Sequence, residues 1–173
     1  MIERAIAVGV PFAWVAADSV YGVGEIEMAL RRAGKSYVLG VNATQAFNSR
    51  VGKPVVAGTA ETIAQGLEPS AWQRLLAGEG SKGPRLSDWA YLKLADLDED
   101  EYRDGATGVW TRGLLIRRNL SDGECAYFTT WCPAGTTAET LVAVEGQRRI
   151  QPARSSLGHS GDARTKRPRN AHT

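Results

Sequence analysis

The sequence predicts an α/β fold that begins with a parallel strand-helix-strand unit. Residues 12–17 and 37–41 are short, continuously apolar runs bounded by turn residues, which is typical of strands covered on both faces. Residues 25–33 lie between these runs, with acidic residues in the first turn, arginines in the last turn and Gly34 after them, as expected of a helix. A strand, a helix and a second strand in this order predict a parallel crossover.

The composition is that of an ordinary globular domain, with 43% apolar and 23% charged residues among 173. Both histidines, His159 and His172, lie near the C-terminus, so residues 1–147 contain none. This excludes Ser-His and Cys-His nucleophile pairs and His-ligated zinc from that part of the chain. The spacing of Cys125 and Cys132 fits neither a disulfide framework nor a zinc knuckle, and favours reduced, buried thiols in a cytoplasmic protein.

Charge divides the chain into an acidic body and a basic tail. Residues 148–173 carry seven basic residues and one acid, a net +6, whereas residues 1–147 have a net charge of −4. Ile150 and Leu157 are the only large apolar residues of residues 149–173, which are otherwise rich in Arg, Pro, Ser and Gly. Such a segment cannot offset its ordering entropy by burial, so residues 149–173 are predicted to be a disordered basic tail.

The rest of the chain is predicted from its periodicity and its turn residues. Helices are expected at residues 2–8, 60–66, 69–77 and 138–147, and strands at 109–118 and 125–131, with a glycine-rich loop at 78–85. Thr136 or Thr137 is the expected cap of the last helix. The expected organisation is a core segment at 1–48, an insertion at 49–108, a return to the core at 109–148 and the tail.

The N-terminus resembles a signal peptide only superficially. The first four residues carry no net charge, and Gly9 and Pro11 interrupt an apolar run that is too short to span a membrane. We therefore expect no membrane partner and a cytoplasmic location.

Two sequence patterns imitate known ligand loops. Residues 78–83 (GEGSKG) match a dinucleotide-binding fingerprint by letter, but a predicted helix precedes them and Pro84 follows, which is the wrong context. Asp96, Asp98 and Asp100 resemble the start of a calcium loop, but Glu101 stands where that loop needs glycine. A flexible loop and a solvated acidic surface are the favoured interpretations.

Asp18 is the strongest candidate functional residue. It follows the first predicted strand, at the edge where an α/β sheet usually binds its ligands. A carboxylate there could bind Mg²⁺, or it could cap a turn, and spacing alone favours the cap.

A resemblance to a known family favours the metal-binding interpretation of Asp18 over the turn cap. Residues 14–22 (WVAADSVYG), 78–90 (GEGSKGPRLSDWA), 114–118 (LLIRR), 126–128 (AYF) and 141–148 occur in order over residues 1–148. This pattern resembles the DDE-type transposases of bacterial insertion sequences, a superfamily of DNA endonucleases. The segment around Asp18 is similar to the one that holds their second catalytic aspartate.

The resemblance implies a ribonuclease-H-like core interrupted by an insertion, in which three carboxylates hold two Mg²⁺ ions for cleavage and transfer of DNA strands. Asp18 is the one residue that falls on a catalytic, metal-binding position. By analogy, Lys82, Arg85, Arg117 and Arg118 could contact DNA phosphates, although a surface charge or a local ion pair explains each of them equally well. The implied partners are transposon-end DNA and an intact transposase.

The sequence also departs from the family pattern. The family's first aspartate belongs to a strand upstream of this segment, and its last glutamate follows a tryptophan, where Arg149 stands here. Since no glutamate follows Glu145, two of the three metal ligands are missing, as a truncated and frameshifted fragment would show. The chain is expected to be inactive alone. Two alternatives are a DNA-binding or transposase-regulating module that uses the basic tail, and a chain that does not fold stably.

Overall fold

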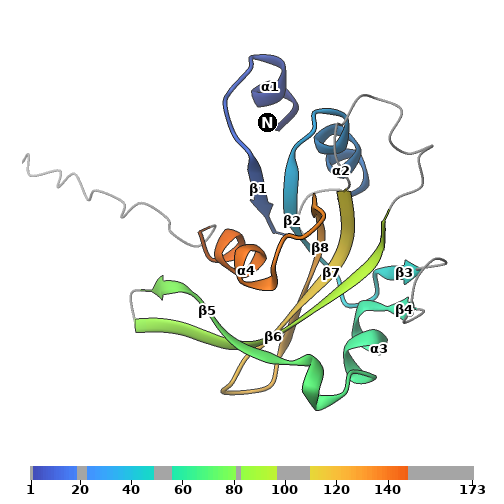
Figure 1. Cartoon of the computed structure of the whole chain (residues 1–173), viewed down its shortest axis with the longest axis vertical. Coiled ribbons are helices and arrows are strands. Elements are labelled where there is room, and N and C mark those ends of the chain that lie inside the picture. The colour runs from blue at the N-terminus through green and yellow to red at the C-terminus, as the bar shows by residue number, and fades with distance from the viewer. Residues whose placement is uncertain (1, 19–22, 49–55, 81–82, 97–109, 148–173) are drawn as a thin grey trace, which may run out of the picture.

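One curled, six-stranded sheet dominates the fold (Figure 1). The structure is a computed structural model, which describes residues 2–18, 23–48, 56–80, 83–96 and 110–147. In spatial order the sheet contains β1 (Trp14–Ala17), β2 (Ser36–Val41), β8 (Cys125–Pro133), β7 (Trp110–Arg118), β6 (Gly83–Asp96) and β5 (Gln73–Gly80). A separate two-stranded ribbon pairs β3 (Ala46–Asn48) with β4 (Ala57–Thr59).

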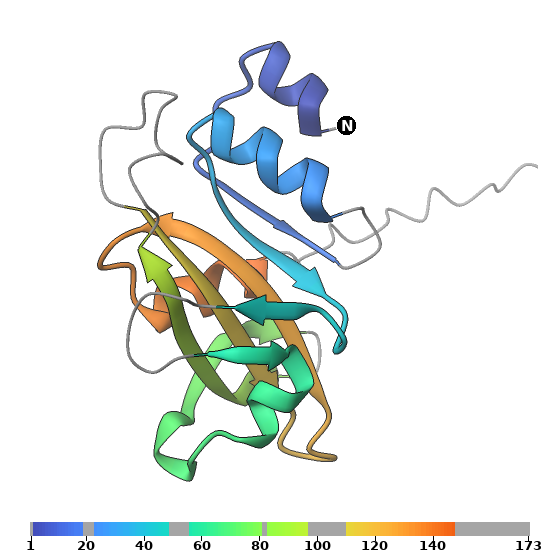
Figure 2. The same ribbon diagram turned by 90° about the vertical axis from the view of Figure 1, so that its right-hand side faces the viewer.

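The predicted strand-helix-strand unit is confirmed. β1 pairs in parallel with β2, and α2 (Val23–Arg32) lies between them in the chain. Every residue of β2 is buried, as predicted, whereas all four residues of β1 are only half-buried because β1 is an edge strand. Figure 2 shows α1 (Ile2–Ala7) beside α2, next to these two strands.

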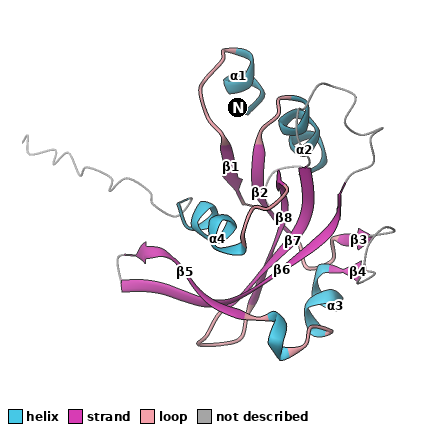
Figure 3. Ribbon diagram, in the orientation of Figure 1, coloured by secondary structure: helices cyan, strands magenta, loops and turns pink. Residues whose placement is uncertain are grey.

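All other pairings in the sheet are antiparallel, including that of β2 with β8. The fold is therefore a mixed α/β arrangement with few helices, as the secondary structure in Figure 3 shows. β5 and β6 come from residues predicted as an insertion, and they extend the same sheet through β7.

The predicted helix at 69–77 is wrong. Only Pro69–Ala71 forms a short 3-10 turn (η1), and Gln73–Gly80 is strand β5. Leu75 packs against the core while Arg74 and Leu76 are exposed, which is the two-residue alternation of a strand. The predicted glycine loop is also wrong at its ends, because Gly78–Gly80 and Gly83–Arg85 continue the two strands.

The predicted helices at 2–8, 60–66 and 138–147 and the predicted strands at 109–118 and 125–131 agree with the structure to within two residues, whereas strands β3, β4 and β6 were not predicted. α3 (Ala60–Gln65) begins after Thr59, whose hydroxyl accepts a hydrogen bond from the backbone N–H of Thr62 at 3.2 Å. α4 (Ala138–Gln147) has the predicted bounds, and Thr137 is its cap, accepting from the N–H of Thr140 at 3.4 Å.

The core lies on both faces of the sheet. α4 covers one face over a cluster of apolar residues: Val38, Ala77, Trp89, Leu115, Phe128, Cys132, Leu141 and Val142. The opposite face carries a second cluster with α3 and the β3–β4 ribbon, and a third with α1 and α2. Cys125 and Cys132 are free thiols, the first half-buried and the second fully buried.

None of the helices in the described ranges is both long enough and apolar enough to cross a membrane. The predicted disordered tail at 149–173, Lys82 and the acidic residues after Asp96 lie outside the described residues.

Candidate functional site

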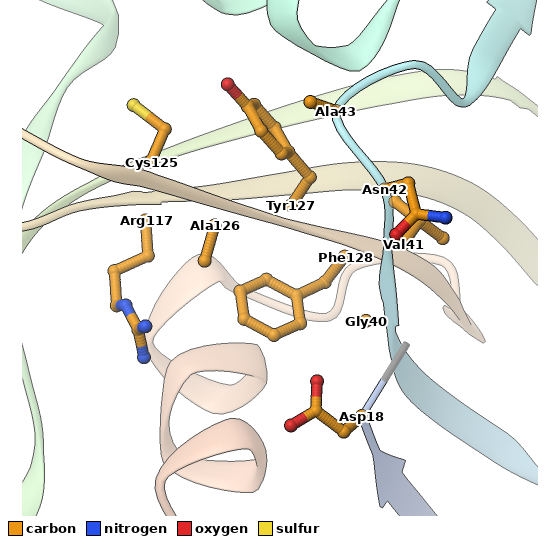
Figure 4. Close-up of a pocket in the computed structure, with 10 residues that line it drawn as sticks. All are labelled: Asp18, Gly40, Val41, Asn42, Ala43, Arg117, Cys125, Ala126, Tyr127 and Phe128. Carbon is orange, nitrogen blue, oxygen red and sulfur yellow. The ribbon is translucent and has the colours of Figure 1, made fainter. Parts of the chain in front are cut away.

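Asp18 follows directly after β1, at the end where both β1 and its parallel neighbour β2 finish. Its side chain is exposed and lines a cavity of about 270 Å³ (Figure 4). The cavity lies where the chain leaves β2, so that the first residues of β8 have no β2 partner. Its lining residues are Asp18, Gly40, Val41, Asn42, Ala43, Arg117, Cys125, Ala126, Tyr127 and Phe128.

The two charged side chains of this cavity lie on one side of β8. In Figure 4, Asp18 and Arg117 both lie on the side where α4 packs, with Ala126 and Phe128 between them. The side chain of Tyr127 projects to the opposite side, as the alternation of a strand requires. The cavity thus has a carboxylate and a guanidinium in its lining, and it lies at the C-terminal end of the parallel pair β1–β2.

This donor set does not fit a pair of Mg²⁺ ions. Of the described residues, one carboxylate, Asp18, and one amide, Asn42, line the cavity, while the positive charge of Arg117 opposes a second cation. Among the described residues, His, Cys, Asp and Glu side chains form no group of three or more that could hold a metal. Two-metal phosphoryl transfer needs more carboxylates than the described residues bring together.

Arg117 is held by a buried carboxylate on α4. Its Nη1 lies 3.2 Å from Oε1 of Glu145, and the exposed fractions of the two side chains are 13% and 1%. The guanidinium also lies 6.0 Å from the centre of the Trp89 ring. Arg117 therefore has a defined orientation between the sheet and the helix.

A second cavity, of about 190 Å³, is lined by both members of this ion pair. Arg85 lines it and donates from Nη2 to two backbone carbonyls, that of Ala77 at 3.2 Å and that of Gly146 at 2.8 Å. The lining residues are Ala77, Pro84, Arg85, Leu86, Ser87, Arg117, Asn119 and Glu145. The structure thus brings Arg85 and Arg117 to one cavity, although they are far apart in the sequence.

Arg118 lies elsewhere. Its Nη2 donates to Oδ2 of Asp88 at 3.3 Å, and its guanidinium stacks over the ring of Trp72 at 4.0 Å. Since neighbouring residues of a strand point to opposite faces, Arg118 and Arg117 cannot serve the same site. Lys82, the fourth predicted DNA-binding residue, lies outside the described residues.

Glu145 was not singled out from the sequence, although a signal for it exists. It follows Leu141 and Val142 at helical spacing, and all three residues are buried on the inner side of α4. A carboxylate on the apolar stripe of a helix needs a buried partner. The sequence alone does not show that this partner is Arg117.

Comparison of the chain with known protein families, curated proteins and solved structures found no match.

Proposed function

We propose that this chain is part of a DDE-type DNA transposase and that it does not cleave DNA by itself. The observation that carries the proposal is the position of Asp18. The sequence pattern assigns this residue to a metal-binding position, and its carboxylate lies at the C-terminal end of a parallel strand, beside a cavity that also holds Arg117. Ligand sites of α/β sheets occur at this edge.

The proposal includes a ribonuclease-H-like core to which β1, α2 and β2 belong, with residues 49–108 as an insertion. The parallel pairing of β1 with β2 supports it, because a parallel crossover is the unit from which such cores are built. The proposed location is cytoplasmic, where the DNA of a bacterial insertion sequence is found.

Inactivity follows from the number of carboxylates. One aspartate cannot hold two metal ions in the geometry that in-line attack on a phosphodiester requires. Asp18 would be one ligand of such a centre, and the described residues bring no group of three or more possible ligands together. Mg²⁺ is the ion that this chemistry would use.

A nicking assay on supercoiled DNA with Mg²⁺ or Mn²⁺ tests the inactivity. We expect no nicking above background from the wild-type chain, from Asp18→Asn or from the control Asp122→Asn, which changes a carboxylate in the turn before β8. Metal-dependent nicking that Asp18→Asn abolishes and Asp122→Asn leaves intact would contradict the proposed inactivity.

The DNA that flanks the reading frame tests the family assignment. We expect upstream codons to encode a strand with an aspartate, and a shifted downstream frame to restore a tryptophan and a glutamate after Arg148. If neither frame contains these residues, the transposase origin is wrong.

The charge distribution favours one alternative, a DNA-binding or transposase-regulating module that uses the basic tail. Seven basic residues against one acid in residues 148–173 would give salt-dependent binding to phosphates without sequence preference. Gel shifts with a chain in which Arg164, Lys166, Arg167 and Arg169 are changed to Gln test this module. Loss of all DNA binding would favour it, and retained, sequence-selective binding would contradict it.

A further inference from the structure

We infer that Arg85 and Arg117 together form a phosphate-binding site in the cavity between β6, β7 and α4, and that Glu145 is the residue that positions Arg117. The phosphate site stands on its own geometry. Its assignment to a DNA phosphate deepens the proposed function and rests on it.

The charges in this cavity favour an anion. Among the described residues, two guanidinium groups, from β6 and β7, and one carboxylate, that of Glu145, line the cavity, so their charges sum to +1. Ser87 and Asn119 add a hydroxyl and an amide to the lining. The planar fork of arginine matches the oxygen atoms of a phosphate better than any other cationic side chain does.

Arg85 has a donor left for a ligand. Its Nη2 is used by the carbonyls of Ala77 and Gly146, and its Nε is closed off from solvent without a hydrogen-bond partner among the described residues. Its Nη1 has no hydrogen bond to any described residue and is not buried, so a phosphate oxygen in the cavity can accept a hydrogen bond from it. The side chain is therefore anchored at Nη2 and open to a ligand at Nη1.

Both guanidinium groups are fixed before any ligand arrives. Arg85 is tied to the backbone of β5 and to the end of α4, and Arg117 is tied to Glu145, whose side chain is only 1% exposed. Because these side chains have already lost their rotamer freedom on folding, binding would not have to order them. Glu145 would act through Arg117 and would not contact the phosphate, with which it shares the same sign of charge.

The ¹H–¹⁵N signals of the arginine Nε–H groups, followed by NMR during a titration of the full chain with inorganic phosphate, test the site. We expect the Arg85 and Arg117 signals to move together and saturate with one dissociation constant. The signals of Arg32 and Arg74, which are exposed on α2 and β5, should not saturate. If the Arg85 and Arg117 signals change no more than that of Arg32, the site does not exist. This measurement needs no variant.

The positioning role of Glu145 is tested with the charge-removing variant Glu145→Gln and the control Glu139→Gln, an exposed residue of the same helix. Glu145→Gln raises the charge of the described lining from +1 to +2, which by itself favours an anion, but we expect the loss of the charged anchor of Arg117 to outweigh this and to weaken phosphate binding by about tenfold, while Glu139→Gln keeps the wild-type affinity. Equal affinities of the two variants would overturn the role. If Glu145→Gln does not fold, Glu145→Asp keeps the charge on a shorter side chain and should also bind phosphate more weakly.

Duplex DNA distinguishes the two sources of the phosphate. The tail is present in every variant, so its contribution cancels when variants are compared. For Arg117→Gln, the slope of log affinity against log salt concentration should fall by about 0.9 relative to Arg32→Gln, as expected for one lost phosphate contact. If Arg117 responds to inorganic phosphate but the two slopes agree, the site binds free phosphate, and the assignment to DNA is wrong while the site remains.

Discussion

The carboxylate of Glu145 lies 3.2 Å from the guanidinium of Arg117, and this ion pair joins α4 to β7 across the inner face of the sheet. Both side chains are largely withdrawn from water. The pair connects two cavities: Arg117 lines the cavity of Asp18, and both residues line the cavity of Arg85. It is therefore the structural link between the two candidate sites.

Removing one member of this pair should destabilise the fold strongly. We expect Glu145→Ala to lower the free energy of unfolding by about 3–5 kcal/mol, because it removes the carboxylate that lies 3.2 Å from a largely buried guanidinium. The double variant Glu145→Leu/Arg117→Met should recover most of this loss, since it removes both charges and keeps similar volume. Urea unfolding of both variants measures the effect, with Glu139→Ala as an exposed control. A loss below about 1 kcal/mol for Glu145→Ala would show that the pair behaves like a surface ion pair.

Gly146 permits a close approach of α4 to β5. A Cβ atom at this position would overlap the backbone carbonyl of Ala77, which cannot move without disturbing the strand. We expect Gly146→Ala to cost about 1–3 kcal/mol or more by overpacking, measured as a fall in the urea midpoint.

Gly24 on α2 is the matched control for this prediction, because a Cβ atom there has no neighbour within 4 Å among the residues that the structure describes. Gly24→Ala should leave stability unchanged or raise it by at most about 1 kcal/mol, since alanine favours a helix. Equal effects of the two substitutions would mean that α4 does not approach β5 as closely as described.

Tyr37 predicts a loss of stability at alkaline pH. Its side chain is fully buried, accepts a hydrogen bond from Nε of Arg31 at 3.0 Å and donates one to Oε1 of Glu27 at 3.1 Å. Burial, and then the negative charge of Glu27, raise the pKa of the Tyr37 hydroxyl far above its ordinary value. A raised pKa in the folded state means that the contribution of this group is complete below about pH 10 and is lost as pH rises further.

The variant Tyr37→Phe isolates the contribution of the Tyr37 hydroxyl to the free energy of unfolding. At pH 7 the variant should be less stable by about 1 kcal/mol, because it loses two hydrogen bonds. Between pH 9 and pH 11 the difference from the wild type should shrink, since phenylalanine cannot ionise. Urea unfolding at several pH values measures both effects. A difference that stays constant over this range would contradict the raised pKa.

The elements that the sequence predicts well are those whose local pattern is decisive. The β1–α2–β2 unit was predictable because apolar runs, charges at the helix ends and Gly34 all indicate the same structure. α4 was predictable to the residue because Thr137 caps it. In these cases local preference and tertiary packing agree.

β5 shows where this reasoning fails. Residues 71–77 contain good helix formers, and nothing local forbids a helix there. They form a strand because they pair with β6, for example Leu75 with Ser87. A contact of this kind overrides local propensity and cannot be read from a single segment.

The candidate site, like the fold, could be predicted only in part from the sequence. The position of Asp18 at a strand end follows from the pattern of residues 12–18. The approach of Arg85 and Arg117 does not, because it depends on how β6 and β7 pair and on where α4 packs. The contact of Glu145 with Arg117 could not be predicted for the same reason, since the two residues are 28 positions apart in the sequence.

Asp88 lies at the centre of a row of three charged residues that face each other across β5, β6 and β7. In the strand register Arg74 stands opposite Asp88, which stands opposite Arg118. Nε of Arg74 lies 3.1 Å from Oδ1 of Asp88, and Nη2 of Arg118 lies 3.3 Å from Oδ2. Desolvation works to raise the pKa of Asp88, but the hydrogen bonds and charges of the two arginines together prevail and lower it.

A lowered pKa in the folded state gives a defined acid dependence. The stabilisation by Asp88 is complete above the ordinary aspartate pKa of about 4 and is lost as pH falls through the lower value of the folded protein. Asp88→Asn should therefore cost at most about 1 kcal/mol at pH 7, because Arg74 is well exposed, and its difference from the wild type should shrink below about pH 4. NMR titration of the Asp88 carboxyl group measures the pKa directly. Arg118→Gln should raise that pKa, and an unchanged value would show that Arg118, stacked on Trp72 at 4.0 Å, does not stabilise the carboxylate.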